Sequence, residues 1–334
     1  MASDQRPGLD PRRLVGLMQS AVGRLNLALD GRTVLTEAAT GAYAVTPVLA
    51  ALAGARVIAL GKPTQHASAD EIASATMELA HAAAVADRVE IVHDTPTDLG
   101  SVDIVTNSGQ VRPIDGDLVS HLRAGCVVPL MYESWEYRSA DLDLEACRAR
   151  GVAVAGTNER HPDVDVFSFL GPLAVHQLHD AGIAVHRCRV VVLCDNDFAP
   201  FITSGLERGG AQVSLASRLS RAVLEPRPDA VLVALKPSGG PVLTSADVDL
   251  LVEHAAGATV AQYWGDVDRE ALDRAGVRVW PRRQPMPGHM AVLLSDIGPD
   301  PIVRLQAGGL KVGEVLARGL GAATPHERLL VQPM

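Results

Sequence analysis

The stretch TVLTEAATGAYAVTPVLAALAGARVIAL, Thr33 to Leu60, predicts the fold of the first part of the chain. It begins with a short apolar run, passes through a turn of small residues into an apolar segment of helical length, and ends with the apolar run Val57–Leu60. A strand, a helix and a second strand in this order form a β-α-β unit, whose two strands are parallel. The stretch therefore predicts a parallel sheet covered by helices.

The same alternation continues along both halves of the chain. In the first half, the short apolar runs are Thr33–Thr36, Val57–Leu60, Val89–Val92, Asp103–Thr106, Cys126–Leu130 and Val152–Ala155. In the second half, they are Arg189–Leu193, Gln212–Leu215, Ala230–Ala234, Ala258–Gln262 and Val277–Trp280. Continuous apolar strands separated by helices are typical of sheets that are covered on both faces. We therefore predict an α/β protein with two Rossmann- or flavodoxin-like, doubly wound parallel-sheet domains and an interdomain cleft.

The predicted domain boundaries follow from the helices. Asp10 and Pro11 are a cap and a first helical residue, so a helix is expected from there to about Leu29. A long linking helix is expected over His161–Gly182, and a closing amphipathic helix over Asp300–Arg318. We expect residues 1–158 and 290–334 to form a substrate or catalytic domain, and residues 159–289 to form a nucleotide-binding domain.

Composition excludes several classes of function. The net charge is −9 and no block of like charges occurs, so we expect no nucleic-acid partner and no membrane-binding patch. The start MASDQRPGLDPRR has no apolar signal core, and no apolar run approaches the roughly 18 residues that span a bilayer. The four cysteines form no CxxC pair, which favours reduced thiols in a cytoplasmic protein and no metal site.

Several motifs resemble the D-2-hydroxyacid dehydrogenases. The run DIVTNSGQVRPIDGDLVSHLRAGCVV and the following DLDLEACRARGVAVAGT are similar to the middle of that family, and a linking helix comes next. Val267–Leu272 resembles a helix start of the family, and His289 lies where the family has its catalytic histidine. The resemblance covers roughly residues 100 to 320. It implies an oxidoreductase that uses NAD or NADP, in which His289 moves the proton that accompanies hydride transfer, and it implies a homodimer.

The chain departs from the dehydrogenase pattern at the cofactor turn. Cys194, Asn196 and Ala199 stand where the three glycines of the dinucleotide fingerprint are expected. Asp195 and Asp197 add negative charge beside a site that would hold a pyrophosphate. If a cofactor binds, the resemblance places it on the residues that follow two strands of the second half: Asp195, Asn196, Asp197, Phe198, Ala199, Lys236 and Pro237.

Substrate and catalytic candidates follow the strands of the first half, because ligands of open parallel sheets bind outside the carboxyl ends of the strands. Glu159 and Arg160 are candidates for a base and an anion-binding group, beside the family-derived His289. The expected substrate-binding residues are Asn107, Ser108, Tyr132, Glu133, Ser134, Trp135 and Asn158. Their alternative roles are helix capping, solvated charge or a dimer contact.

Other interpretations remain open from the sequence. The family's catalytic arginine is absent before Val267, so the substrate is expected to be a small polar metabolite other than a simple 2-hydroxy acid, with a carboxylate or an amine. The turn Glu37–Ala42, with Lys62 after the next strand, is a second, weaker candidate for a phosphate site. The lost glycines favour a non-redox enzyme on the same scaffold, namely a lyase, cyclase or transferase. A ligand-binding protein that has lost catalysis is the third hypothesis.

Overall fold

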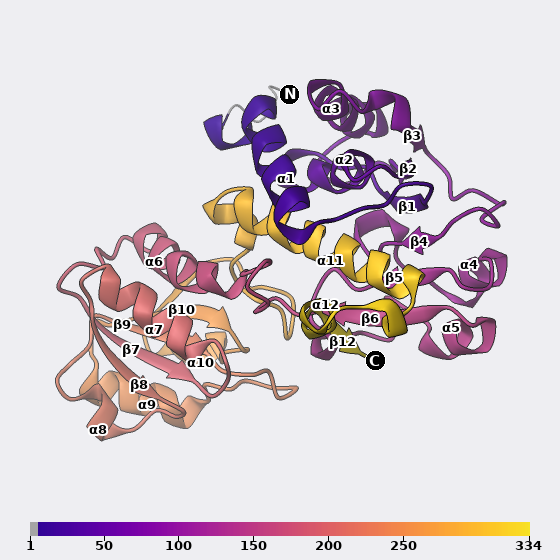
Figure 1. Cartoon of the computed structure of the whole chain (residues 1–334). Helices are drawn as coiled ribbons and strands as arrows, with labels where there is room; N and C mark the ends of the chain where they lie inside the picture. The colour runs from indigo at the N-terminus through magenta and orange to yellow at the C-terminus, as the bar shows by residue number, and fades with distance from the viewer. Residues whose placement is uncertain (1–5) are drawn as a thin grey trace. The chain divides into compact units, whose positions relative to one another are not determined.

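The computed structural model describes residues 6–334, which form two compact units (Figure 1). Unit 1 is Met1–Val166 with Gly298–Met334, and unit 2 is Phe167–Ile297. The residues MASDQ, on which part of the expectation about a signal core rests, lie outside the described residues. No helix within residues 6–334 has the length and apolar character needed to cross a membrane.

Unit 1 contains a seven-stranded sheet in the order β12-β6-β5-β4-β1-β2-β3. Its strands are β1 (Thr33–Glu37), β2 (Arg56–Leu60), β3 (Val89–Val92), β4 (Ile104–Val105), β5 (Val127–Pro129), β6 (Ala153–Thr157) and β12 (Val331–Pro333). Six strands are parallel, and the C-terminal β12 pairs antiparallel with β6. The chain order reverses between β1 and β4, which makes that point a topological switch.

Helices cover both faces of the unit 1 sheet. They are α1 (Pro11–Leu25), α2 (Val45–Leu52), α3 (Ala69–Ala82), α4 (Gly116–His121), α5 (Leu144–Arg150), α11 (Asp300–Arg318) and α12 (Pro325–Leu330). Helix α1 begins as predicted, because the Asp10 carboxylate accepts the N–H groups of Arg12 and Arg13. It ends at Leu25 and not at Leu29, because Asn26 adopts a left-handed conformation with φ of 45°.

Helix α11 is buried along most of its length and packs against β5 and β6. Its small residues make this close packing possible. A Cβ on Gly309 would lie 2.1 Å from the sulfur of Met131, and one on Gly308 would lie 2.7 Å from Val164. Its buried Lys311 is neutralised by Glu314 at 2.9 Å and by Glu327 of α12 at 3.0 Å. The returning end of the chain is thereby fixed to the first part.

Unit 2 contains a five-stranded parallel sheet in the order β11-β10-β9-β7-β8. Its strands are β7 (Arg189–Cys194), β8 (Gln212–Ala216), β9 (Ala230–Ala234), β10 (Thr259–Trp264) and β11 (Arg278–Trp280). Its helices are α6 (Leu170–Asp180), α7 (Ala199–Arg208), α8 (Arg221–Leu224), α9 (Ser245–His254) and α10 (Arg269–Arg274). The switch point lies between β7 and β9.

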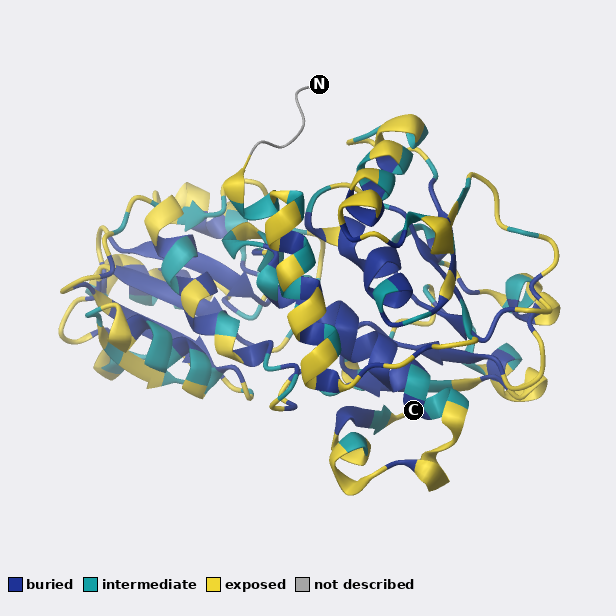
Figure 2. Cartoon of the chain, turned by 45° about the horizontal axis from the view of Figure 1, so that its top comes forward, coloured by how far each residue is buried: buried dark blue, intermediate teal, exposed yellow. Residues whose placement is uncertain are grey.

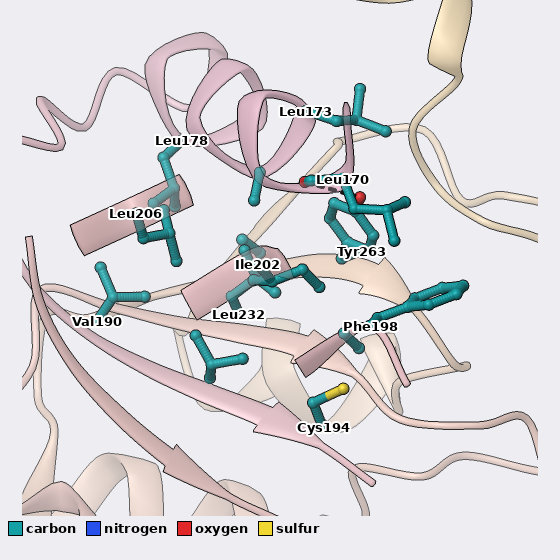
Figure 3. Close-up of a cluster of buried hydrophobic side chains, with 14 of the residues drawn as sticks. Leu170, Leu173, Leu178, Val190, Cys194, Phe198, Ile202, Leu206, Leu232 and Tyr263 are labelled. Carbon is teal, nitrogen blue, oxygen red and sulfur yellow. Dashed lines mark hydrogen bonds between the residues drawn. The ribbon is translucent and has the colours of Figure 1, made fainter. Parts of the chain in front are cut away.

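Two separate hydrophobic cores lie on the two faces of the unit 2 sheet. Figure 3 shows the first, in which side chains of α6 and α7 pack on β7, β9 and β10. Tyr263 is fully buried there and donates its hydroxyl hydrogen to the Leu170 carbonyl at 3.0 Å. Helices α6 and α7 cross closely, because a Cβ on Gly205 would lie 2.3 Å from the Cα of Gly171. In both units the central strands are buried, whereas the edge strand β8 and the outer faces of the helices are largely exposed (Figure 2).

The prediction of two doubly wound α/β domains is confirmed by these two sheets. The predicted linking helix over His161–Gly182 is wrong in its first part. Residues 158–166 form an irregular loop, a 3-10 turn covers Phe167–Phe169, and α6 begins at Leu170. Pro162 disfavours helical geometry at the preceding residue, and Asp165 adopts a positive φ of 52°, which a helix does not contain.

Candidate functional site

The loop after β5, called the aromatic loop below, carries four of the predicted substrate-binding residues: Tyr132, Glu133, Ser134 and Trp135. It contains the 3-10 turn Ser134–Glu136, and its Trp135 indole N–H donates to a carboxylate oxygen of Glu133 at 2.6 Å. Glu133 is buried, whereas Trp135 is 46% exposed. The buried hydroxyl of Tyr132 has no hydrogen-bond partner within residues 6–334, and burial raises its pKa to about 12. The loop therefore presents an exposed indole that is held by a buried carboxylate.

Three carboxyl groups gather around this loop. Glu133 and Glu136 belong to it, and Glu159 comes from the loop after β6. Burial, and secondly the nearby Glu133, raise the pKa of Glu136 to about 7. The pKa of Glu159 lies well above its ordinary value because the group is buried and lies near Glu136 and Glu133. Glu136 can thus gain or lose a proton near neutral pH, as an acid–base group requires.

The C-terminal strand completes the cluster, which the sequence analysis did not anticipate. Gln332 of β12 accepts the N–H of Ser134 at 2.8 Å and donates to Glu133 at 3.2 Å. On β6, a Cβ at Gly156 would lie 2.5 Å from the nitrogen of Ser134, so a glycine is required where the loop crosses the strand. Gln332 and Gly156 are therefore the residues that hold the aromatic loop against the sheet.

Arg160 and Asn158 have different surroundings. The exposed Arg160 guanidinium lies 4.0 Å from Glu133, and Arg138 is a second cation that acts on the cluster, through Glu136. The Asn158 side chain donates to the Leu329 carbonyl at 2.8 Å and accepts the N–H of Arg160 at 3.0 Å. In this structure Asn158 fastens its loop to the C-terminal segment, while its predicted contact with a substrate stays a prediction. Because the predicted helix does not begin at His161, Glu159 and Arg160 lie in the irregular loop and not at a helix start.

The switch point of unit 1 brings Asn107 and Ser108 beside β1. The Ser108 hydroxyl lies 2.8 Å from that of Thr106, which in turn donates to Thr36 at 2.8 Å. Asn107 is 1% exposed, and its carbonyl oxygen accepts the N–H of Met131 at 2.7 Å. Its amide nitrogen has no hydrogen-bond partner among the described residues. Asn107 therefore joins the end of β4 to the beginning of the aromatic loop.

Glu37 lies at the same switch point. It ends β1 and is 8% exposed, and burial raises its pKa to about 7, although Arg112 and the N–H of Gln110 favour the charged form. A Cβ on Gly109 would lie 1.4 Å from a carboxylate oxygen of Glu37, so only glycine fits there. The turn after β1, proposed from the sequence as a phosphate site, thus begins with a buried acid. Gly109 has a φ of 42°, which favours glycine. The presence of this glycine is the feature of the sequence that could have indicated the contact.

The cofactor candidates of unit 2 follow β7. The Asp195 carboxylate accepts the N–H of Lys236 at 2.9 Å. Asn196 donates to the Ala234 carbonyl at 2.7 Å and accepts the N–H of Phe198 at 3.1 Å. These bonds connect the ends of β7 and β9 at the switch point of unit 2.

A dinucleotide pyrophosphate does not fit this turn. Binding of that group requires glycines for close backbone approach and N–H groups at a helix start that point to the ligand. Here the N–H groups of Phe198 and Ala199 bond to Asn196, that of Phe201 bonds to the Phe198 carbonyl, and Pro200 has none. The Asn196 side chain occupies the second glycine position. The turn satisfies its own hydrogen bonds and carries two carboxylates.

The predicted catalytic histidine lies on the segment that follows β11. The N–H of Gly288 donates to Asp266 at 3.1 Å, and its carbonyl accepts the Trp264 indole N–H at 3.2 Å. These bonds hold the segment of His289 at the end of β10. His289 and the cofactor candidates, including Lys236 and Pro237, belong to unit 2, whereas the acidic cluster belongs to unit 1.

Two residues after β8 were not selected from the sequence. Ser217 and Arg218 directly follow Ala216, and both are exposed. In dinucleotide-binding sheets this place holds an acid for the ribose of NAD or an arginine for the 2′-phosphate of NADP. Their place directly after the second strand of the second half is the feature of the sequence that could have indicated them.

Comparison with known proteins identifies the fold. No family model and no curated protein sequence matches the chain. A dipicolinate synthase subunit from Bacillus halodurans matches with a TM-score of 0.54 and 13% identity, over 89% of this chain and 100% of that one. The corresponding chain of dipicolinate synthase from Bacillus subtilis matches with a TM-score of 0.54 and 10% identity, over 89% and 98%. The NAD-dependent formate dehydrogenase from Staphylococcus aureus, in complex with NAD, has a TM-score of 0.46 and 11% identity, over 87% and 95%.

These likenesses concern the fold. The two structures with a TM-score of 0.54 share the two-domain fold of this chain, which is the part of the predicted resemblance that the comparisons bear out. At identities of 10% and 13%, these matches do not transfer a reaction.

Proposed function

We propose that this chain is an enzyme that performs acid–base chemistry on a small, amine-bearing metabolite, without a bound nicotinamide cofactor. The observation that carries the proposal is the carboxyl cluster of Glu133, Glu136 and Glu159 beside an exposed tryptophan at the carboxyl edge of the unit 1 sheet. A parallel sheet places its ligands at that edge. Lyase, cyclase and transferase reactions are the classes that such chemistry serves.

The cluster has the properties that an ammonium group requires. Arg160 lies 4.0 Å from Glu133, and Arg138 acts on Glu136, so the three carboxylates outnumber these two cations once the acids ionise. An ammonium group near Glu136 favours its charged form and lowers its pKa. The Trp135 indole offers an additional cation–π surface. With a pKa near 7, Glu136 can hold or accept a proton at neutral pH.

A second candidate is an NADP-dependent oxidoreductase, which the motif resemblance to the D-2-hydroxyacid dehydrogenases and the pair Ser217–Arg218 favour. A nicotinamide, when bound, would supply hydride transfer. The turn of Asn196 opposes this candidate, because its N–H groups are already bonded. NAD is disfavoured further, because no acid follows β8.

Calorimetry separates the two candidates. The full chain is first screened by thermal shift against amino acids, ω-amino acids and polyamines, and the best amine is titrated near pH 7 in buffers of different ionisation enthalpy. We expect proton release on binding, because the ammonium ionises Glu136, and we expect Glu136→Gln to abolish that release. Glu145→Gln, an exposed glutamate of α5, is the matched control.

NADPH and NADH are titrated in parallel, with tryptophan fluorescence and calorimetry as the readouts. NADPH binding at micromolar concentration that Arg218→Ala weakens would establish the second candidate and overturn the first. A chain that binds neither an amine nor a nicotinamide would contradict both. The buried, unpaired thiols of all four cysteines suit a cytoplasmic protein, and location and homodimer formation stay predictions of the sequence.

A further inference from the structure

Two histidines and an aspartate meet at one place in unit 1, outside the acidic cluster. His161 and Asp163 lie on the loop after β6, and His326 lies on α12. His326 Nε2 is 2.6 Å from Asp163 Oδ2, and His161 Nδ1 is 4.0 Å from the same oxygen. One ligand atom of each residue lies within 4.8 Å of the other two. Segments separated by more than 150 positions in the sequence thus converge on one point.

The hydrogen bonds of His161 fix which ring nitrogen carries its lone pair. His161 is 2% exposed, and its Nε2 donates to the His326 carbonyl at 3.2 Å. Its Nδ1 accepts the N–H of Asp163 at 3.2 Å, so this nitrogen carries the lone pair, and a bound metal would take the place of that N–H. Metal-binding histidines commonly donate their other N–H to a backbone carbonyl, which fixes tautomer and orientation.

We propose that His161, Asp163 and His326 form a binding site for a divalent first-row transition metal, with zinc as the first candidate. Zinc binds imidazole and carboxylate ligands at about 2.0 to 2.2 Å, which places tetrahedral ligand atoms about 3.3 Å apart. The two distances from Asp163 Oδ2, 2.6 Å and 4.0 Å, lie on either side of that value. A small shift of the partly exposed Asp163 carboxylate toward His161 lengthens the first distance and shortens the second. Three protein ligands leave the remaining coordination position to solvent.

The metal joins the loop of residues 158–166 to the C-terminal segment. The loop is already tied to that segment through Asn158, and the Asp163 carbonyl accepts the Arg24 Nε at 2.8 Å. The same loop carries Glu159 and Arg160, which lie at the acidic cluster. Bound metal therefore stiffens the loop that positions these two side chains. This inference is independent of the proposed reaction.

Metal binding is measured on the full, untagged chain after treatment with a chelator. Co²⁺ is titrated while its visible absorption is followed, and Zn²⁺ is titrated by calorimetry. We expect one metal ion per chain, and visible absorption bands of the intensity typical of four-coordinate Co²⁺. His326→Ala and Asp163→Asn change partly exposed side chains and should leave the fold intact, as circular dichroism will check. Each should weaken binding by about tenfold or more.

His176 and Asp180 on α6 provide the control. They form a similar histidine–aspartate pair at 3.3 Å, without a third ligand in the described part of the chain. His176→Ala should leave metal affinity unchanged. The proposal is overturned if the wild-type chain binds neither metal, or if His326→Ala and Asp163→Asn bind as tightly as the wild type.

Discussion

Replacing Glu37 by glutamine should make the stability of unit 1 less dependent on pH. The carboxyl group is packed on Gly109, and its burial raises its pKa from 4.5 to about 7. The folded chain therefore binds more protons than the unfolded chain between these two values. Stability from this group is complete below about pH 4.5 and is lost as the pH rises through about 7. The pKa differs by about 2.5 between the unfolded and folded chain, and each pKa unit corresponds to about 1.36 kcal/mol. The lost stability is therefore about 3 kcal/mol.

Glutamine keeps the acceptor for the N–H of Gln110 and removes the ionisation. Glu37→Gln should therefore match the wild type near pH 5 and exceed it by up to about 3 kcal/mol at pH 8. The assay is urea unfolding in a Trp264→Phe, Trp280→Phe background, where Trp135 is the only tryptophan and reports on unit 1. Glu145→Gln, on the surface of α5, should leave the pH profile unchanged. Parallel pH profiles for Glu37→Gln and the wild type would refute the reasoning.

Three further predictions address other parts of the molecule. Gly205→Ala places a methyl group 2.3 Å from the Cα of Gly171, so urea unfolding should show a loss of at least about 2 kcal/mol in the stability of unit 2. The control Gly23→Ala, in α1, meets no neighbouring atom and should raise stability by about 0.5 to 1 kcal/mol. Gln332→Ala removes two hydrogen bonds of the aromatic loop and should cost unit 1 about 1 to 3 kcal/mol in the same assay, and an unchanged midpoint would contradict the role given to β12. Asn196→Gly frees the turn after β7, so NADPH titration should show tighter binding, and an unchanged affinity would show that the side chain is not the obstacle.

The regular elements could be predicted because their sequence signals are local. The run Ala230–Ala234 coincides with β9, and Asp300–Arg318 coincides with α11. Buried parallel strands are continuous apolar runs, and a long helix repeats its apolar positions many times. The error at His161–Gly182 is also local, since the pattern of apolar residues outweighed Pro162 and the turn at Asp165.

The candidate site could be predicted only in part. Glu133 and Glu159 were selected because they follow parallel strands, and the structure places both in one cluster. Glu136 was passed over, although its pKa near 7 makes it the acid most suited to neutral pH. Its burial depends on packing between distant segments, as does the contact of Gln332. The strand of Gln332 has three residues and no periodic signal, so its pairing with β6 was not predictable.

The turn after β7 shows why a fold can persist while a cofactor site changes. Strand pairing and the cores on both sheet faces do not depend on the residues at this turn. A dinucleotide site depends on backbone N–H groups that have no partner until the phosphates arrive. The Asn196 side chain supplies such a partner within the protein and also bonds to β9. A free N–H group at a helix start costs stability when water is excluded, and its satisfaction from within stabilises the turn. An asparagine at the place of the second fingerprint glycine therefore favours a rigid, internally bonded turn over one that is open to a pyrophosphate.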